Sequence, residues 1–247
     1  DVHEEVIKPN VVEFGADSVP SLKSLMKFIP ADKLWPPDWD VWQYWGLFYY
    51  NQFRRAKTEL GDSLEAFIYN TQKYEALVVK EQIELLRQKK YQPVCSMYLY
   101  YWSDACPLMG SGLFDYYREP YQVYESMKAV YTEVLISLEW NEEPHVIGRP
   151  KKYIRGDQFA GKIWVTNDHF HSIPDAKIFW CITDTEGNRV KEKTFTLDLR
   201  EDCAEVVDTI KWKIPEDYVG EYKISMCVED GTGNILSRNS TVIMATE

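Results

Sequence analysis

The stretch Asn10-Val11-Val12-Glu13-Phe14-Gly15 decides how the first half of the chain folds. It is a short apolar run that ends at a glycine, and this pattern predicts a buried β-strand. Glu13 then lies at the carboxyl end of the strand, where parallel α/β architectures place their catalytic groups. A solvated glutamate at the end of an ordinary strand is the alternative. Glu13 is therefore the first candidate for chemistry.

Helices and a second strand follow in the order of α/β units. Pro20–Met26, Asp40–Leu60 and Asp62–Lys90 predict helices, the last of them long and amphipathic. Val94–Trp102 carries no charge and is rich in β-prone residues, as expected of a strand buried on both faces. Pro120–Tyr131 returns to helix. Two successive units of a (β/α) barrel have this order, and two units cannot close a barrel.

Short strands with turn signals between them begin near Val134, which predicts a β-sandwich. The two hairpin-type turns are Glu186-Gly187-Asn188 and Asp230-Gly231. The expected fold class is α/β plus all-β, with domains at 1–133 and 134–247. The candidate strands are Val134–Trp140, Gln158–Thr166, Ala176–Thr183, Lys191–Leu199, Val206–Lys213, Gly220–Glu229 and Ile235–Met244.

Charge and hydropathy argue against nucleic acid and membranes as partners. The chain has 28 Lys and Arg against 39 Asp and Glu, a net charge of −11 that repels phosphate backbones and anionic lipid. No apolar run approaches the roughly 20 residues of a membrane helix. The first residues lack the pattern of a signal peptide. The missing Met suggests a processed or excised start.

Cysteines and histidines indicate no metal site and no cofactor. The five cysteines are widely spaced and form no Cys-x-x-Cys pair, so neither a disulfide framework nor a zinc site is indicated. Unpaired thiols favour a reducing, cytoplasmic compartment, with a periplasmic or secreted location as the alternative. Only His169 and His171 are close together, no third ligand can be named, and their neighbours favour a surface turn.

The sequence around Glu13 resembles the nucleophile segment of β-mannosidase-like enzymes in glycoside hydrolase family two. There a strand ends in Ser-Glu-Phe-Gly, and a Ser-x-Pro-Ser-Leu helix start follows shortly. Glu13-Phe14-Gly15 and Ser18-Val19-Pro20-Ser21-Leu22 match in type and spacing, while Val12 replaces the usual serine. The resemblance implies that Glu13 is the nucleophile of a retaining glycosidase. It also implies that 1–133 is the C-terminal part of the catalytic barrel and 134–247 the immunoglobulin-like domain after it.

A second match lies one βα unit later, at Tyr100–Pro107 and Phe114–Pro120. The family has Asn-Asp-x-Trp-Pro there, followed by Asp-Tyr-Tyr. Asp104 and the proline match, whereas serine and cysteine stand for the family's asparagine and tryptophan. The resemblance implies that Trp102 and Asp104 line the sugar pocket, with Trp102 as a stacking platform. A core tryptophan and a surface aspartate are the alternative.

The family's general acid/base is an Asn-Glu pair upstream of the nucleophile, and this chain has no such pair there. Asn141-Glu142 follows the nucleophile and is not expected to take its place. The resemblance thus implies a fragment of a retaining exo-β-glycosidase that hydrolyses terminal β-linked sugars and is nearly inactive alone. Expected partners are a β-linked oligosaccharide or glycoside, and either a second copy or the missing N-terminal domains. The alternative is a non-catalytic carbohydrate-binding or interaction module, for which the 36 aromatic residues (9 Trp, 17 Tyr, 10 Phe) would supply the surface.

Overall fold

The computed structural model describes residues 7–47, 53, 58–139 and 151–247. The chain divides into two compact units, which are described separately. The α/β unit contains Asn10–Gln82 and Ser96–Lys128, and the sandwich unit contains Ile83–Cys95 and Ala129–Glu247. The predicted division between residues 133 and 134 stays a prediction.

The α/β unit is built on two short pairs of parallel strands. Strand β1 (Asn10–Phe14) pairs with β2 (Ser96–Leu99), and β3 (Tyr101–Ser103) pairs with β4 (Gly112–Phe114). Parallel partners require a crossover, and helices supply it between β1 and β2. The helices of this part of the chain are α1 (Leu22–Leu25), the 3₁₀ turn η2 (Ala31–Lys33), α2 (Trp39–Tyr44), α4 (Leu64–Gln88) and α5 (Gln122–Val130).

Aromatic side chains form much of the core of the α/β unit. Trp42 is fully buried, its indole N–H donates to the Lys33 carbonyl at 2.9 Å, and its ring lies 5.6 Å from that of Phe67. Val19 and Leu25 belong to the same cluster. Part of the unusual aromatic content therefore serves packing rather than a ligand.

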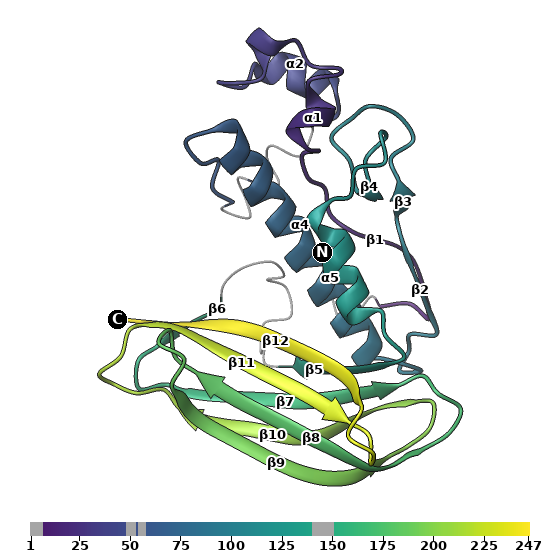
Figure 1. Cartoon of the computed structure of the whole chain (residues 1–247), viewed down its shortest axis with the longest axis vertical. Helices are drawn as coiled ribbons and strands as arrows, with labels where there is room; N and C mark the ends of the chain where they lie inside the picture. Colours follow the sequence, from purple (N-terminus) through teal and green to yellow (C-terminus); the bar gives the residue numbers. More distant parts are fainter. Residues whose placement is uncertain (1–6, 48–52, 54–57, 140–150) are drawn as a thin grey trace. The chain divides into compact units, whose positions relative to one another are not determined.

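The sandwich unit consists of two sheets packed face to face (Figure 1). The three-stranded sheet has the order β10-β7-β5 and the five-stranded sheet the order β6-β12-β11-β8-β9. Inward residues alternate with outward ones along β7 and β11, and they meet in a core that includes Ile163 and Ile224. The strands are β5 (Val134–Glu139), β6 (Lys151–Ile154), β7 (Gln158–Asn167), β8 (Ile173–Thr183), β9 (Arg189–Leu199), β10 (Cys203–Lys213), β11 (Gly220–Glu229) and β12 (Ile235–Thr246).

The structure confirms the β1 strand, the long α4 helix, the α5 helix and the seven candidate strands of the sandwich. It also adds a strand that was not expected. Lys151 and Lys152 begin β6, which pairs in parallel with β12. Two consecutive lysines do not indicate a strand, yet charged side chains are tolerated at the edge of a sheet because they can point to water there. The helix predicted over 40–60 is interrupted after Tyr44 by a turn at 45–47. Phe53 is helical, 58–60 are not, and the other residues of this range lie outside the described part of the chain.

The expected burial of the two barrel-like strands is wrong. On β1 only Phe14 is buried, and Val12 is 67% exposed. The run 94–102 splits into β2 and β3, whose residues are exposed or half-buried. The physical reason is that each parallel sheet has two strands among the described residues, so nothing flanks them as in a complete sheet. No helix in the described ranges is both long and apolar enough to cross a membrane.

Candidate active site

Glu13 is the last residue but one of β1, and its side chain is exposed to solvent. The next residue, Phe14, is buried, and its carbonyl accepts a hydrogen bond from the Tyr100 backbone N–H at 3.0 Å. Within the described part of the chain, the Glu13 carboxylate has no hydrogen-bond or ion-pair partner. An anchored backbone and a free carboxylate at the end of a strand suit a group that attacks a ligand.

The segment that follows Glu13 is buried and held by side chains of α4. The Val19 N–H donates to Thr71 Oγ1 at 3.2 Å, and Gln72 Nε2 donates to the Val19 carbonyl at 2.9 Å. The Ser18 hydroxyl donates to Glu75 Oε2 at 2.6 Å, entirely out of contact with water. The loop after the candidate nucleophile is thus fixed by the helix that crosses over from β1 to β2.

Asp104 lies just beyond β3 and is 2% exposed, so the alternative of a surface aspartate is wrong. One carboxylate oxygen accepts the Gly112 backbone N–H at 3.1 Å, and the other accepts the Tyr121 hydroxyl at 2.8 Å. Burial raises the pKa of Asp104 to about 6, against the lowering effect of these hydrogen bonds. Asp104 holds together the turn between β3 and β4.

Trp102 is exposed, whereas Asp104 is buried. It lies on β3 with 69% of its surface exposed, so the alternative of a core tryptophan is also wrong. Its ring centroid is 6.0 Å from that of Phe114. Further exposed rings lie nearby in the sequence: Tyr98, Tyr100, Tyr101. Exposed aromatic faces can stack on apolar or sugar surfaces.

Two further buried carboxyls belong to the site and were missed by sequence reasoning. Burial raises the pKa of Asp17 to about 6, although its hydrogen bond from Ser111 opposes the shift. Burial raises the pKa of Glu75 well above its ordinary value, and the charges of Asp17 and Asp104 raise it further. Glu75 follows Thr71 by four residues, so it lies on the inner face of α4, and that spacing was the available signal.

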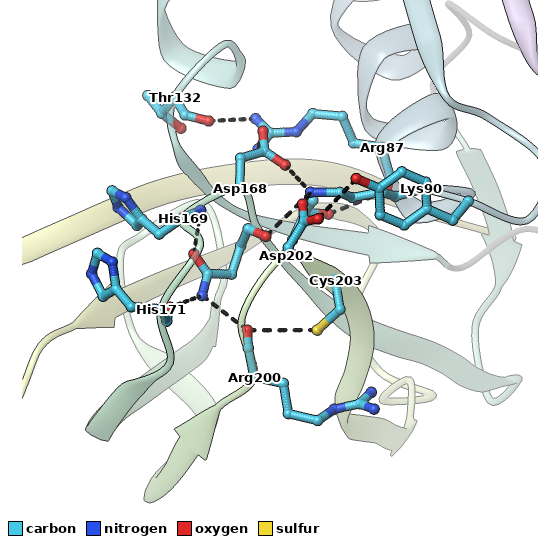
Figure 2. Close-up of polar contacts among 12 residues, drawn as sticks. Arg87, Lys90, Thr132, Asp168, His169, His171, Arg200, Asp202 and Cys203 are labelled. Atoms are coloured by element: carbon cyan, nitrogen blue, oxygen red, sulfur yellow. Dashed lines mark hydrogen bonds and ion pairs between the residues drawn. The ribbon is translucent and has the colours of Figure 1, made fainter.

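The described residues contain no group of three or more His, Cys, Asp or Glu side chains arranged to hold a metal ion. His169 and His171 lie in a bend, as the sequence predicted, and their rings stack at 4.8 Å (Figure 2). His169 Nε2 is 3.8 Å from the exposed Glu133 carboxylate. Asn141-Glu142 lie outside the described residues.

A charged network joins the end of α4 to the sandwich unit's loops (Figure 2). Lys90 pairs with Asp168 at 2.7 Å and with Asp202 at 2.6 Å. Arg87 is buried and donates to the carbonyls of Val130 and Thr132 at 2.8 and 2.6 Å. It also pairs with Asp168 at 2.9 Å. This network is structural, because its cations are already paired.

Comparison with known proteins gives no match to a family model and none to a curated protein. Solved structures do match. A β-D-mannosidase from Dictyoglomus thermophilum superposes with a TM-score of 0.78 at 16% identity, over 98% of this chain and 29% of that enzyme. An exo-chitosanase from Amycolatopsis orientalis gives 0.70 at 15% identity, over 95% of this chain and 27% of that enzyme. At these identities the likeness is one of fold, so this chain has the fold of a segment that makes up less than a third of each of these two glycosidases.

Proposed function

We propose that this chain is the nucleophile-bearing part of a retaining exo-β-glycosidase of the β-mannosidase-like kind in glycoside hydrolase family two. The observation that carries the proposal is Glu13, an exposed carboxylate at the end of a strand whose neighbour β2 runs parallel to it. Sequence resemblance and the fold of two glycosidases support the same conclusion independently.

The architecture supports this assignment. The unit β1, α4, β2, α5 has the order of the last two βα units of a (β/α) barrel, with parallel pairing between its strands. The sandwich unit has sheets of three and five strands, with β8, β11 and β12 in one and β5, β7 and β10 in the other. That arrangement is typical of immunoglobulin-like domains.

In the proposed reaction Glu13 supplies the nucleophile. An oxygen of Glu13 attacks the anomeric carbon, the bond from that carbon to the leaving oxygen breaks, and water later hydrolyses the glycosyl-enzyme. The leaving oxygen needs a proton from a second carboxyl about 5–5.5 Å away. In this proposal that acid/base is not one of the 247 residues, so the chain alone turns over ordinary glycosides very slowly.

The substrate is a terminal β-linked sugar. Trp102 offers its exposed ring as a platform for the C–H-rich face of a pyranose, next to the rim that Asp104 shapes by holding the β3–β4 turn. Both roles are proposals from the resemblance and from the contrast in burial between the two side chains.

The test uses a dinitrophenyl β-mannoside with fluorine in place of the hydroxyl beside the anomeric carbon, called the fluorinated probe below. Dinitrophenolate leaves without a proton, so glycosylation of the nucleophile needs no general acid. Fluorine slows hydrolysis of the product, which then accumulates. In the protein expressed from its native gene, we expect dinitrophenolate release and a mass increase on the peptide that contains Glu13.

Two variants sharpen the result. Glu13→Gln should abolish labelling while a β-mannoside still binds, and Glu65→Gln, an exposed glutamate on α4, should label as the wild type does. Labelling of another carboxylate, or undiminished labelling of Glu13→Gln, would refute the proposed nucleophile. Rapid turnover of ordinary aryl β-glycosides by the 247 residues alone would refute the need for an external acid.

The exposed ring of Trp102 and those of the tyrosines near it in the sequence favour one other function, a non-catalytic carbohydrate-binding module. Calorimetry with mono- and oligosaccharides separates the two. Micromolar binding that survives Glu13→Gln and is lost in Trp102→Ala, without any covalent labelling of the wild type, would favour the binding module.

A further inference from the structure

Helix α4 grips the segment after Glu13 through one polar stripe, made of Thr71, Gln72, Glu75 and Gln82. These positions are spaced so that they share one face of a helix. Every member contacts the residues 15–19, which begin two positions after the candidate nucleophile. The contacts are Gln82 Nε2 to Gly15 O at 3.5 Å, Ser18 Oγ to Glu75 Oε2 at 2.6 Å, Val19 N to Thr71 Oγ1 at 3.2 Å and Gln72 Nε2 to Val19 O at 2.9 Å.

Glu75 is the ionisable member of the stripe, and it is buried. It is 1% exposed, and its bond to Ser18 is the shortest of the four contacts. The Ser18 backbone N–H is also fixed, because it donates to the Gly110 carbonyl at 2.9 Å. Ser18 is therefore held from two directions, and a buried hydroxyl that loses such a partner is costly.

We propose that Glu75 is a positioning residue for Glu13: it pins the segment 15–19 to α4 and so keeps the Glu13 carboxylate aimed from the end of β1. This rests on the proposed role of Glu13 as nucleophile. Four residues lie between Glu13 and Ser18, and the first of them, Phe14, is buried, so a displacement of Ser18 is transmitted to Glu13 along a short segment. Displacement of a reacting group by about 1 Å costs on the order of 100-fold in rate.

The surroundings of Glu75 determine which of its charge states is present when it holds the segment 15–19. The titratable groups that act on it are the carboxyls of Asp17 and Asp104, and Tyr121 in turn feels its charge. The Ser18 hydroxyl is the one group that lowers its pKa. Burial favours the neutral form of Glu75. The neutral carboxyl still accepts from Ser18 through its carbonyl oxygen, so the hold on the segment does not need a charge.

The experiment compares Glu75→Gln and Glu75→Ala with the matched controls Glu65→Gln and Glu65→Ala on the exposed side of the same helix. The protein is expressed from its native gene. Its rate constant of labelling by the fluorinated probe is separated from the probe's dissociation constant, at several pH values. Hydrogen exchange of the peptide covering residues 14–20 is followed in parallel.

In Glu75→Ala we expect labelling to slow by about 10- to 100-fold with the dissociation constant changed less than about twofold. Glu75→Gln retains the acceptor without a charge. It should label at about the wild-type rate, because the hold on Ser18 depends on the acceptor oxygen rather than on a charge. Exchange of the peptide 14–20 should accelerate in Glu75→Ala and in neither control.

Labelling of Glu75→Ala at the wild-type rate would overturn the positioning role, and so would equal slowing in Glu65→Ala. If wild-type Glu13 is never labelled, the proposed function fails, while the exchange measurement still decides whether Glu75 holds the segment. Unchanged exchange in Glu75→Ala would overturn that hold whatever the chemistry at Glu13.

Discussion

Replacement of Asp104 by asparagine should flatten the dependence of the α/β unit's stability on pH. Burial raises the pKa of Asp104 from 3.8 to about 6 in the folded chain. A carboxyl whose folded pKa is raised binds its proton more tightly when folded. Its stabilisation is fully present below the unfolded pKa near 4 and is lost as the pH rises through about 6. The wild type should therefore lose stability between pH 4 and pH 7.

The size of the Asp104 pKa shift determines how much the free energy of unfolding changes with pH. A displacement of about two pKa units corresponds to about 3 kcal/mol between acidic and neutral pH. Asparagine keeps an oxygen for the Gly112 N–H, and its amide can donate to the Tyr121 oxygen, so both contacts of Asp104 survive as neutral bonds. Loss of the charge-assisted bonds costs about 1 kcal/mol. We expect Asp104→Asn to be more stable than the wild type by about 1–2 kcal/mol at pH 8 and slightly less stable at pH 4.

The assay is urea unfolding at pH 4 to 8 read by brief proteolysis, because the two units can unfold separately. Cleavage within the peptides of Asn10–Gln82 and Ser96–Lys128 reports the α/β unit. Asp32→Asn, an exposed aspartate on η2, is the matched control and should keep the wild-type pH dependence. Parallel pH profiles for the wild type and Asp104→Asn would refute the reasoning, since they would mean that Asp104 carries no raised pKa.

Three other changes test the structure at separate points. Trp102→Ala should leave the free energy of unfolding within about 0.5 kcal/mol because the side chain is exposed, yet it should weaken sugar binding measured by calorimetry. Gly110→Ala should destabilise the α/β unit by more than about 2 kcal/mol in urea unfolding, because the added Cβ would lie 1.9 Å from Asp104 Oδ2. Arg87→Lys should destabilise the sandwich unit by about 2 kcal/mol in thermal unfolding, because one ammonium cannot replace the guanidinium that serves two carbonyls and Asp168; unchanged stability would contradict the assigned network.

Local pattern was enough to find most of the elements. Helical spacing predicted α4 and alternation predicted the sandwich strands, because each of these signals comes from a face that packs against its neighbours. The run at 10–14 predicted β1 through its β-prone residues. Burial of β1 could not be predicted from such a pattern. Whether Val12 is covered depends on which strands lie beside it, and that is a property of the assembled sheet rather than of the run itself.

The candidate site divides in the same way. Glu13 was identified from its position at a strand end and from the resemblance of its neighbours. Glu75 was not, because a glutamate on a helix is ordinarily a solvated residue, and its partner Ser18 lies 57 positions away in the sequence. For Asp104 and Trp102 the resemblance named the residues, but polarity suggested the opposite burial for each. Hydrogen bonds from Gly112 and Tyr121 make the buried aspartate tolerable, and they become visible only in three dimensions.

The charged network at the end of α4 determines how this protein can be divided into separate domains. Residues 83–95 belong to the sandwich unit although more than thirty residues separate them from its first strand. A sandwich that begins at Val134 would leave Asp168 and Asp202 without their ion-pair partner Lys90. It would also lose Gln88, which donates to Ser137 inside β5. A domain exchange between related proteins should therefore transfer the last turns of α4 together with the sandwich. The transferred part would come from two separate stretches of the gene.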